Sequence, residues 1–211
     1  MKNFVDLSML LYDKAEVFEL DPKTEFVQYQ TIDSLGYNIK KLTMSSHLGT
    51  HVDAPNHWLK DGETIENIEL SRFIGKAVVI DLSHKKAGSF IDVEDLEPYA
   101  HHFSRGAKVV LRTDWGEKYG EDIYFSKFPH ITVAAGKWIA DKKIGLLGLE
   151  TPSVNTTDYA RIHRDLLNEE IVILEGLTNV KSIPVEEFEL IALPLRIKGG
   201  DGSPVRAIGM Y

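Results

Sequence analysis

The chain of 211 residues contains no cysteine and carries a formal net charge of −8 at pH 7. The lack of cysteine excludes disulfide frameworks, thiolate metal sites and cysteine nucleophiles. The acidic balance argues against a nucleic-acid partner, because phosphate binding relies on clustered Lys and Arg. The length suits one domain that buries its own core, so we expect a single domain over residues 1–211.

The N-terminal stretch Met-Lys-Asn-Phe-Val-Asp-Leu-Ser lacks the apolar core of a signal peptide. No apolar run approaches the roughly 18 residues that a membrane span needs. We therefore expect a soluble cytoplasmic protein without a membrane partner.

The hydrophobic pattern predicts strands interleaved with helices. Continuous β-branched runs such as residues 77–82 are typical of strands buried on both faces of a sheet. Neither an internal repeat nor a linker interrupts the series, which indicates one α/β domain. In chain order we predict strands at 4–8, 37–45, 77–82, 108–112, 144–149, 171–174 and 190–197, and helices at 93–100, 132–142 and 159–168.

Two further features fall between these elements. His101 and His102 end the helical stretch that Pro98 interrupts, and near a helix C-terminus such side chains are usually solvated. The loop at 113–120 contains Trp115. This loop could line a pocket for a planar substrate, or its aromatic groups could simply cover the core.

Residues 47–57 read His-Leu-Gly-Thr-His-Val-Asp-Ala-Pro-Asn-His and hold three of the eight histidines. Imidazole and carboxylate groups together suit Zn²⁺ or Mn²⁺. Glycine and proline disfavour a helix here. In an extended segment His51 and Asp53 would share one face, and a break at Gly49 would let His47 join them. Ordinary surface or core histidines are the alternative, but the number of ligand groups favours a metal-binding loop.

Two later residues could complete a metal site. Glu175 follows the predicted strand at 171–174, and a carboxylate at the end of a buried strand is costly unless it is paired or coordinated. Alternatively, the strand end reaches solvent and Glu175 is hydrated. His163, in the preceding helical stretch, is the histidine nearest to Glu175 in sequence. Taken alone, it would be a surface helix residue.

The spacing His-x-Gly-Thr-His-x-Asp-x-Pro-x-His at 47–57 resembles the signature of the cyclase-like metal-dependent hydrolases, which include bacterial kynurenine formamidases and isatin hydrolases. The resemblance continues through Glu-Thr-Pro-Ser at 150–153, where the family often has Asp-Thr-Pro-Ser, and through His163, Leu-Glu-Gly-Leu at 174–177 and Gly-Ser-Pro-Val-Arg at 202–206. The segment Phe-Glu-Leu-Asp-Pro at 18–22 departs from the formamidases, because it lacks their Trp and their Pro-Gly turn.

This resemblance implies a swivelling β/β/α domain that assembles as a homodimer or homotetramer. It also implies one or two Zn²⁺ ions per chain, with Mn²⁺ as the alternative metal. His57 would be the acid–base residue, and Asp53 and Glu175 would be candidates to bridge two ions. The implied metal ligands are His47, His51, Asp53, His163 and Glu175.

The implied activity is amide hydrolysis by a metal-activated water, and the expected substrate is N-formylkynurenine, which would give kynurenine and formate. An isatin-like lactam, or another small amide, ester or lactone, is the alternative substrate. A non-catalytic metal-binding protein is the alternative of a different class. Such a protein would have a coordinatively closed site, whereas a hydrolase keeps an open position.

Overall fold

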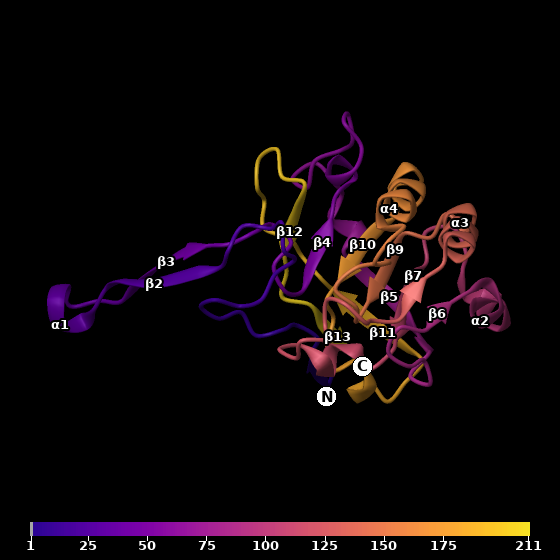
Figure 1. The fold of residues 1–211 in the computed structure, drawn as a ribbon, viewed down its shortest axis with the longest axis horizontal. Coiled ribbons are helices and arrows are strands. Elements are labelled where there is room, and N and C mark those ends of the chain that lie inside the picture. Colours follow the sequence, from indigo (N-terminus) through magenta and orange to yellow (C-terminus); the bar gives the residue numbers. More distant parts are fainter. Residues whose placement is uncertain (1) are drawn as a thin grey trace.

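The computed structural model describes residues 2–211, and the largest sheet within them has nine strands (Figure 1). The centre of this sheet is parallel and consists of β5 (Ile74–Asp81), β7 (Lys108–Arg112), β9 (Leu146–Leu149) and β10 (Val172–Glu175). Next to β5, the sheet continues with three antiparallel strands, in the order β11 (Glu187–Ile191), β13 (Ile208–Met210) and β1 (Phe4–Asp6). Next to β10, it continues with two antiparallel strands, β4 (His51–Asp53) and then β12 (Gly202–Pro204). The expected α/β class is confirmed.

Helices α3 (Val133–Lys142) and α4 (Tyr159–Asn168) pack on one face of the sheet and match the predicted ranges closely (Figure 1). Thr132 caps α3 by accepting a hydrogen bond from the Ala135 N–H at 3.1 Å. Gly136 lets α4 approach, because a Cβ at this position would lie 2.8 Å from Ile162. Together the two helices bury one of the two apolar faces of the central strands.

The predicted helix at 93–100 changes type along its length. It begins as α2 (Val93–Leu96) and continues as the 3₁₀-helix η3 (Glu97–His102). Pro98 has no N–H to donate to the preceding turn, which disfavours a continuous α-helix. The other short elements are η1 (Pro55–His57), η2 (Leu70–Arg72), η4 (Trp115–Lys118) and η5 (Val180–Ser182), and a small parallel pair of β6 (Phe90–Ile91) and β8 (His130–Ile131).

Side chains of the central strands alternate between two apolar clusters. In β5, Ile80 packs with the residues of the helices, whereas Ala77 packs in the cluster on the opposite face. In β10, Ile173 faces the helices in the same way. Because alternate residues of a strand project to the same face, Glu175 also points toward the helical side. This alternation decides which face carries the polar residues at the end of β10.

A hairpin arm, defined here as residues 25–43, projects away from the body (Figure 1). It consists of β2 (Glu25–Gln30), β3 (Ile39–Thr43) and, between them, the one-turn helix α1 (Ile32–Leu35). Every residue of β3 is exposed. The strand predicted at 37–45 therefore exists, but it belongs to the arm and not to the main sheet.

The strand predicted at 190–197 was wrong in its bounds. The observed strand β11 covers Glu187–Ile191, and Pro194 cannot donate a ladder hydrogen bond beyond it. Pro194 forms only an isolated bridge with Val205.

Among residues 2–211, no helix has both the length and the apolar character needed to cross a membrane.

Candidate active site

Strand register brings three polar residues together on the helical face of the sheet. In the antiparallel pair of β4 and β10, His51 lies opposite Glu175, and Asp53 lies opposite Ile173. Residues directly opposite one another share a face, as do residues two apart in one strand. His51, Asp53 and Glu175 therefore project to the same side, and all three are buried. The Nε2 atom of His51 lies 3.4 Å from Asp53 Oδ1 and 3.5 Å from Glu175 Oε2.

Helix α4 supplies His163 to the same point. Its Nε2 atom lies 3.4 Å from Asp53 Oδ2 and 3.4 Å from Glu175 Oε1. Its Nδ1 atom lies 2.7 Å from the Tyr159 carbonyl oxygen, and a carbonyl can only accept, so Nδ1 carries a proton. His51 Nδ1 pairs with the Gly49 carbonyl in the same way at 2.9 Å. Both rings thus present Nε2 to the carboxylates, as metal-ligating histidines do.

Two buried carboxylate oxygens in this cluster, Asp53 Oδ2 and Glu175 Oε1, have no hydrogen-bond partner. Leaving such charged atoms unsatisfied away from water is costly. The ligand atoms of His51, Asp53 and Glu175 all lie within 4.8 Å of one another. A divalent cation would compensate the two orphan oxygens, and imidazole with carboxylate is a donor set that zinc and manganese accept. The residues present therefore fit a metal ion.

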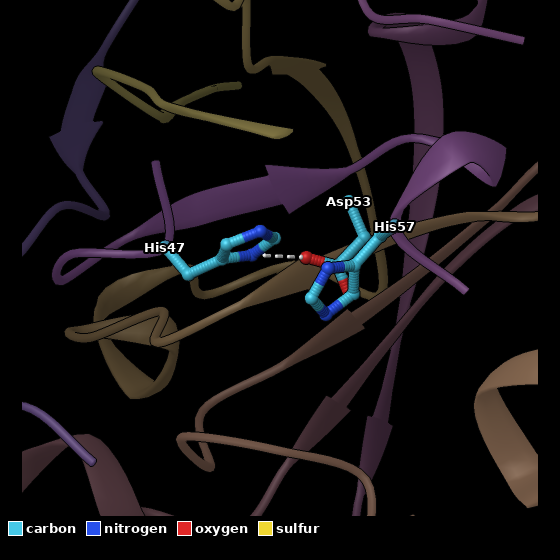
Figure 2. Close-up of side chains that lie close together, drawn as sticks. All are labelled: His47, Asp53 and His57. Atoms are coloured by element: carbon cyan, nitrogen blue, oxygen red, sulfur yellow. Dashed lines mark hydrogen bonds and ion pairs between the residues drawn. The ribbon is translucent and has the colours of Figure 1, made fainter. Parts of the chain in front are cut away.

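A second cluster shares Asp53 with the first. Figure 2 shows the His47 and His57 side chains next to the Asp53 carboxylate, with a hydrogen bond from the His47 ring to Asp53. His47 Nδ1 lies 2.9 Å from Asp53 Oδ1, and the potential ligand atoms of the three residues lie within 4.8 Å of one another. Because one carboxylate serves both clusters, Asp53 stands where it could bridge two ions. Gly202 makes room for His47, since a Cβ there would lie 2.8 Å from the His47 ring.

Asp201 is a site residue that the sequence analysis missed. Its Oδ2 atom lies 3.0 Å from His47 Nε2 and 3.5 Å from His57 Nδ1, and its Oδ1 atom accepts a hydrogen bond from the Ser46 hydroxyl at 2.9 Å. Hydrogen bonds from the two histidines hold the pKa of Asp201 well below its usual range. Asp201 is distant in sequence from the other members of the cluster and directly precedes β12, whose pairing with β4 brings it to the site.

Glu150, in the Glu-Thr-Pro-Ser segment, has a supporting position. It accepts hydrogen bonds from the backbone N–H groups of Thr113 and Asp114 at 2.7 and 2.6 Å. Burial raises the pKa of Glu150 to about 7 despite these two donors. Glu150 thereby ties the loop after β7 to the end of β9.

A cleft of about 510 Å³ opens over the buried histidines. Trp58, Tyr159, Phe18 and Phe125 contribute aromatic surface to it. Trp115 does not line the cleft: it is buried with Met9, Tyr124 and Phe128, so the packing interpretation is correct for Trp115. Tyr119 of the same loop lines a neighbouring pocket together with His47 and His51. The segment that departs from the formamidase pattern contributes Phe18, Glu19, Leu20 and Asp21 to the wall. The cleft thus combines a polar floor with aromatic walls.

The buried carboxylates control the protonation of the histidines. Burial disfavours the charged imidazolium, but the negative carboxylates that face the rings outweigh it and raise the pKa of His47 to about 9 and those of His51 and His163 to about 10. Without metal, all three rings are therefore protonated at neutral pH.

We expect zinc binding to metal-free protein at pH 7 to release protons, because only neutral imidazole is a ligand. The apparent zinc affinity should rise with pH until the pKa values of about 9 and 10 are passed. Isothermal titration in buffers of different ionisation enthalpy measures this release. A binding enthalpy that does not depend on the buffer would contradict it.

Comparison with known proteins agrees with this site. The family model "Putative cyclase" matches residues 5–156. A kynurenine formamidase from Bacillus cereus is 32% identical over 208 residues, which is 97% of this chain and 96% of that protein. The crystal structure of an isatin hydrolase bound to the product analogue thioisatinate superposes with a TM-score of 0.91 at 26% identity, covering 100% of this chain and 92% of that one. A predicted metal-dependent hydrolase from Bacillus stearothermophilus superposes with a TM-score of 0.83 at 25% identity, covering 100% and 98% of the two chains.

The six residues expected at the site, which are His47, His51, Asp53, His57, His163 and Glu175, lie together around the Asp53 carboxylate. The matched proteins are hydrolases, which disfavours the alternative of a non-catalytic metal-binding protein. The chain belongs to the cyclase family of metal-dependent hydrolases.

Proposed function

We propose that this chain is an arylformamidase that hydrolyses N-formylkynurenine to kynurenine and formate. The convergence of three histidines and two carboxylates on the floor of an aromatic-walled cleft carries the proposal. The polar floor suits the formamide group, and the aromatic walls suit the aryl ring of the substrate. Similarity to kynurenine formamidases over nearly the whole chain supports this substrate over other amides.

In this proposal His47, His51, Asp53, His163 and Glu175 hold one or two Zn²⁺ ions, with Mn²⁺ as the alternative. Asp53, which faces three of the histidines, and Glu175, which faces two, are the candidates to bridge a pair of ions. A bound divalent cation lowers the pKa of water toward neutrality and polarises a carbonyl oxygen. The buried carboxylates offset the cationic charge, and the cleft keeps one side open to substrate.

His57 is the proposed acid–base residue. Its Nδ1 atom faces the Asp201 carboxylate at 3.5 Å, which leaves Nε2 to exchange a proton in the cleft. His57 would take a proton from the attacking water and return it to the leaving nitrogen, so that the amide C–N bond breaks and a neutral amine departs. Asp201 would orient the ring and stabilise its charged form, as the carboxylate partner of a catalytic histidine does.

The deciding experiment is the hydrolysis of N-formylkynurenine by zinc-loaded protein, with a chelator-treated control and a parallel isatin assay. We expect turnover of the formamide that is lost on chelation and restored by zinc. A protein that is inactive on the formamide but bound to zinc would refute the substrate assignment.

An isatin-like lactam is the second candidate substrate, and two observations favour it. The fold resembles that of an isatin hydrolase along its full length, and the segment that departs from the formamidase pattern lines the cleft at Phe18 and Leu20. Chelator-sensitive opening of isatin without formamide turnover would support it.

We further propose that residues 1–211 act as one catalytic domain in the cytoplasm and assemble as a homodimer, with a homotetramer as the larger alternative. The hairpin arm supports assembly with a second copy. Its apolar side chains lack cover from their own chain: Ile32 is 62% exposed, Leu35 56% and Tyr37 49%. Apolar groups gathered on a projecting element mark an interaction site.

Replacing both Ile32 and Leu35 by aspartate should shift the protein toward monomer, because two charges would be buried in the interface. Asp33→Asn, an exposed polar change on the same turn, is the matched control. Sedimentation velocity measures the outcome. Equal molecular mass of the wild type and the double variant would contradict a role of the arm in assembly.

A further inference from the structure

A group of metal-binding side chains lies outside the catalytic cleft. His101 and His102 end the 3₁₀-helix η3, and Glu186 directly precedes β11. One potential ligand atom from each residue lies within 4.8 Å of those of the other two. None of the three lines the catalytic cleft. The group is therefore a separate feature of the surface.

The backbone holds both halves of this group in place. The carbonyl of Glu186 accepts a hydrogen bond from the Val79 N–H of β5 at 2.9 Å, which ties the residue to the main sheet. Phe103, which follows His102, is buried and packs edge-on against Trp138 with ring centroids 4.9 Å apart. The three side chains thus project from anchored segments, which lowers the entropy lost when an ion orders them.

The contact between His102 and Glu186 differs from an ordinary hydrogen bond. Glu186 Oε1 lies 2.7 Å from His102 Nε2, yet this buried nitrogen has no hydrogen-bond partner, so the oxygen lies away from the N–H direction. The His101 ring lies against the His102 ring at a tilt of 43°, with ring centroids 3.9 Å apart, a position that would be repulsive for two imidazolium groups. A linear hydrogen bond between His102 and Glu186 therefore does not describe this contact.

We propose that His101, His102 and Glu186 form a second metal site that takes Zn²⁺ or a similar borderline divalent cation. Two imidazoles and one carboxylate are a ligand set that zinc accepts, with water completing its coordination. A cation held here neutralises the carboxylate and needs both rings in the neutral form. It links η3 to the strand pair β5–β11, so that binding stabilises the folded protein.

The test uses full-length protein that has been loaded with zinc and then freed of excess metal. Calorimetric titration with further Zn²⁺ should reveal one additional equivalent per chain. His101→Ala and Glu186→Gln should each weaken this binding by more than about tenfold, since even indirect changes around a metal cost that much. His84→Ala, at an exposed histidine outside the group, is the matched control and should bind as the wild type does.

A second readout locates the ion. Substoichiometric Cu²⁺ should broaden the ring proton signals of His101 and His102 in NMR spectra of the zinc-loaded protein before those of His84. Absence of an additional equivalent in the wild type would overturn the proposal. An additional equivalent that persists in both variants would also overturn it, because that zinc would lie elsewhere. Neither outcome depends on which substrate the enzyme hydrolyses.

Discussion

Asp53→Asn is expected to abolish zinc retention and hydrolysis together. The Asp53 carboxylate lies 2.9 Å from His47, 3.4 Å from His51 and 3.4 Å from His163, so one change affects every histidine of the proposed metal centre. Asparagine keeps the shape but removes the negative charge and one acceptor oxygen. Because changes outside the ligand shell already cost about 10–100-fold in affinity or activity, this one should cost more than about 100-fold.

Zinc content by elemental analysis and formamide turnover should be measured on the same samples. Asp61→Asn is the matched control, because Asp61 lies exposed in the turn after η1. Circular dichroism separates loss of metal from loss of fold. If the D53N protein retained wild-type zinc content after dialysis, Asp53 would not be a ligand, and the proposed bridging role would fail with it.

The part of this proposed centre that lies in residues 47–57 could be predicted because its signal is local. His51 and Asp53 stand two residues apart, and a strand places such residues on one face whatever surrounds it. Glu175 was ambiguous, since a strand end can lie in water or in the core. In the structure Glu175 pairs with His51 of β4 and is only 3% exposed, so this strand end lies in the core. His163 was also ambiguous, because a single histidine in a predicted helix can face solvent or the core, and only the packing of the helix decides between them.

Asp201 could not be found in this way. It lies in a glycine-rich loop, where an aspartate usually serves a turn. Its contact with His47 depends on β12 pairing with β4, which is a long-range event that local patterns do not encode.

The hairpin arm was missed for a different reason. Strand β2 buries none of its residues fully, so the alternation that normally marks a strand is weak there.

His57→Ala is expected to lower turnover by about 10²–10⁴-fold, the usual contribution of a general acid–base group, while zinc content stays at the wild-type value. The structure leaves a specific alternative to exclude. The His57 ring lies 4.0 Å from the His47 ring, and its ligand atom lies within 4.8 Å of those of His47 and Asp53, so His57 could itself bind the metal.

Zinc content distinguishes the two roles. All five proposed ligands remain in the H57A protein, so a proton-transfer residue can be removed without loss of metal. Added imidazole should then restore part of the turnover, because the deleted ring leaves space beside Asp201 for a small base. His84→Ala, at an exposed histidine, controls for loss of an imidazole elsewhere. Normal rates in H57A would exclude His57 from catalysis. Zinc loss in parallel with activity would make His57 a ligand and leave proton transfer to another group, such as Asp201, whose carboxylate lies 3.5 Å from His57 Nδ1.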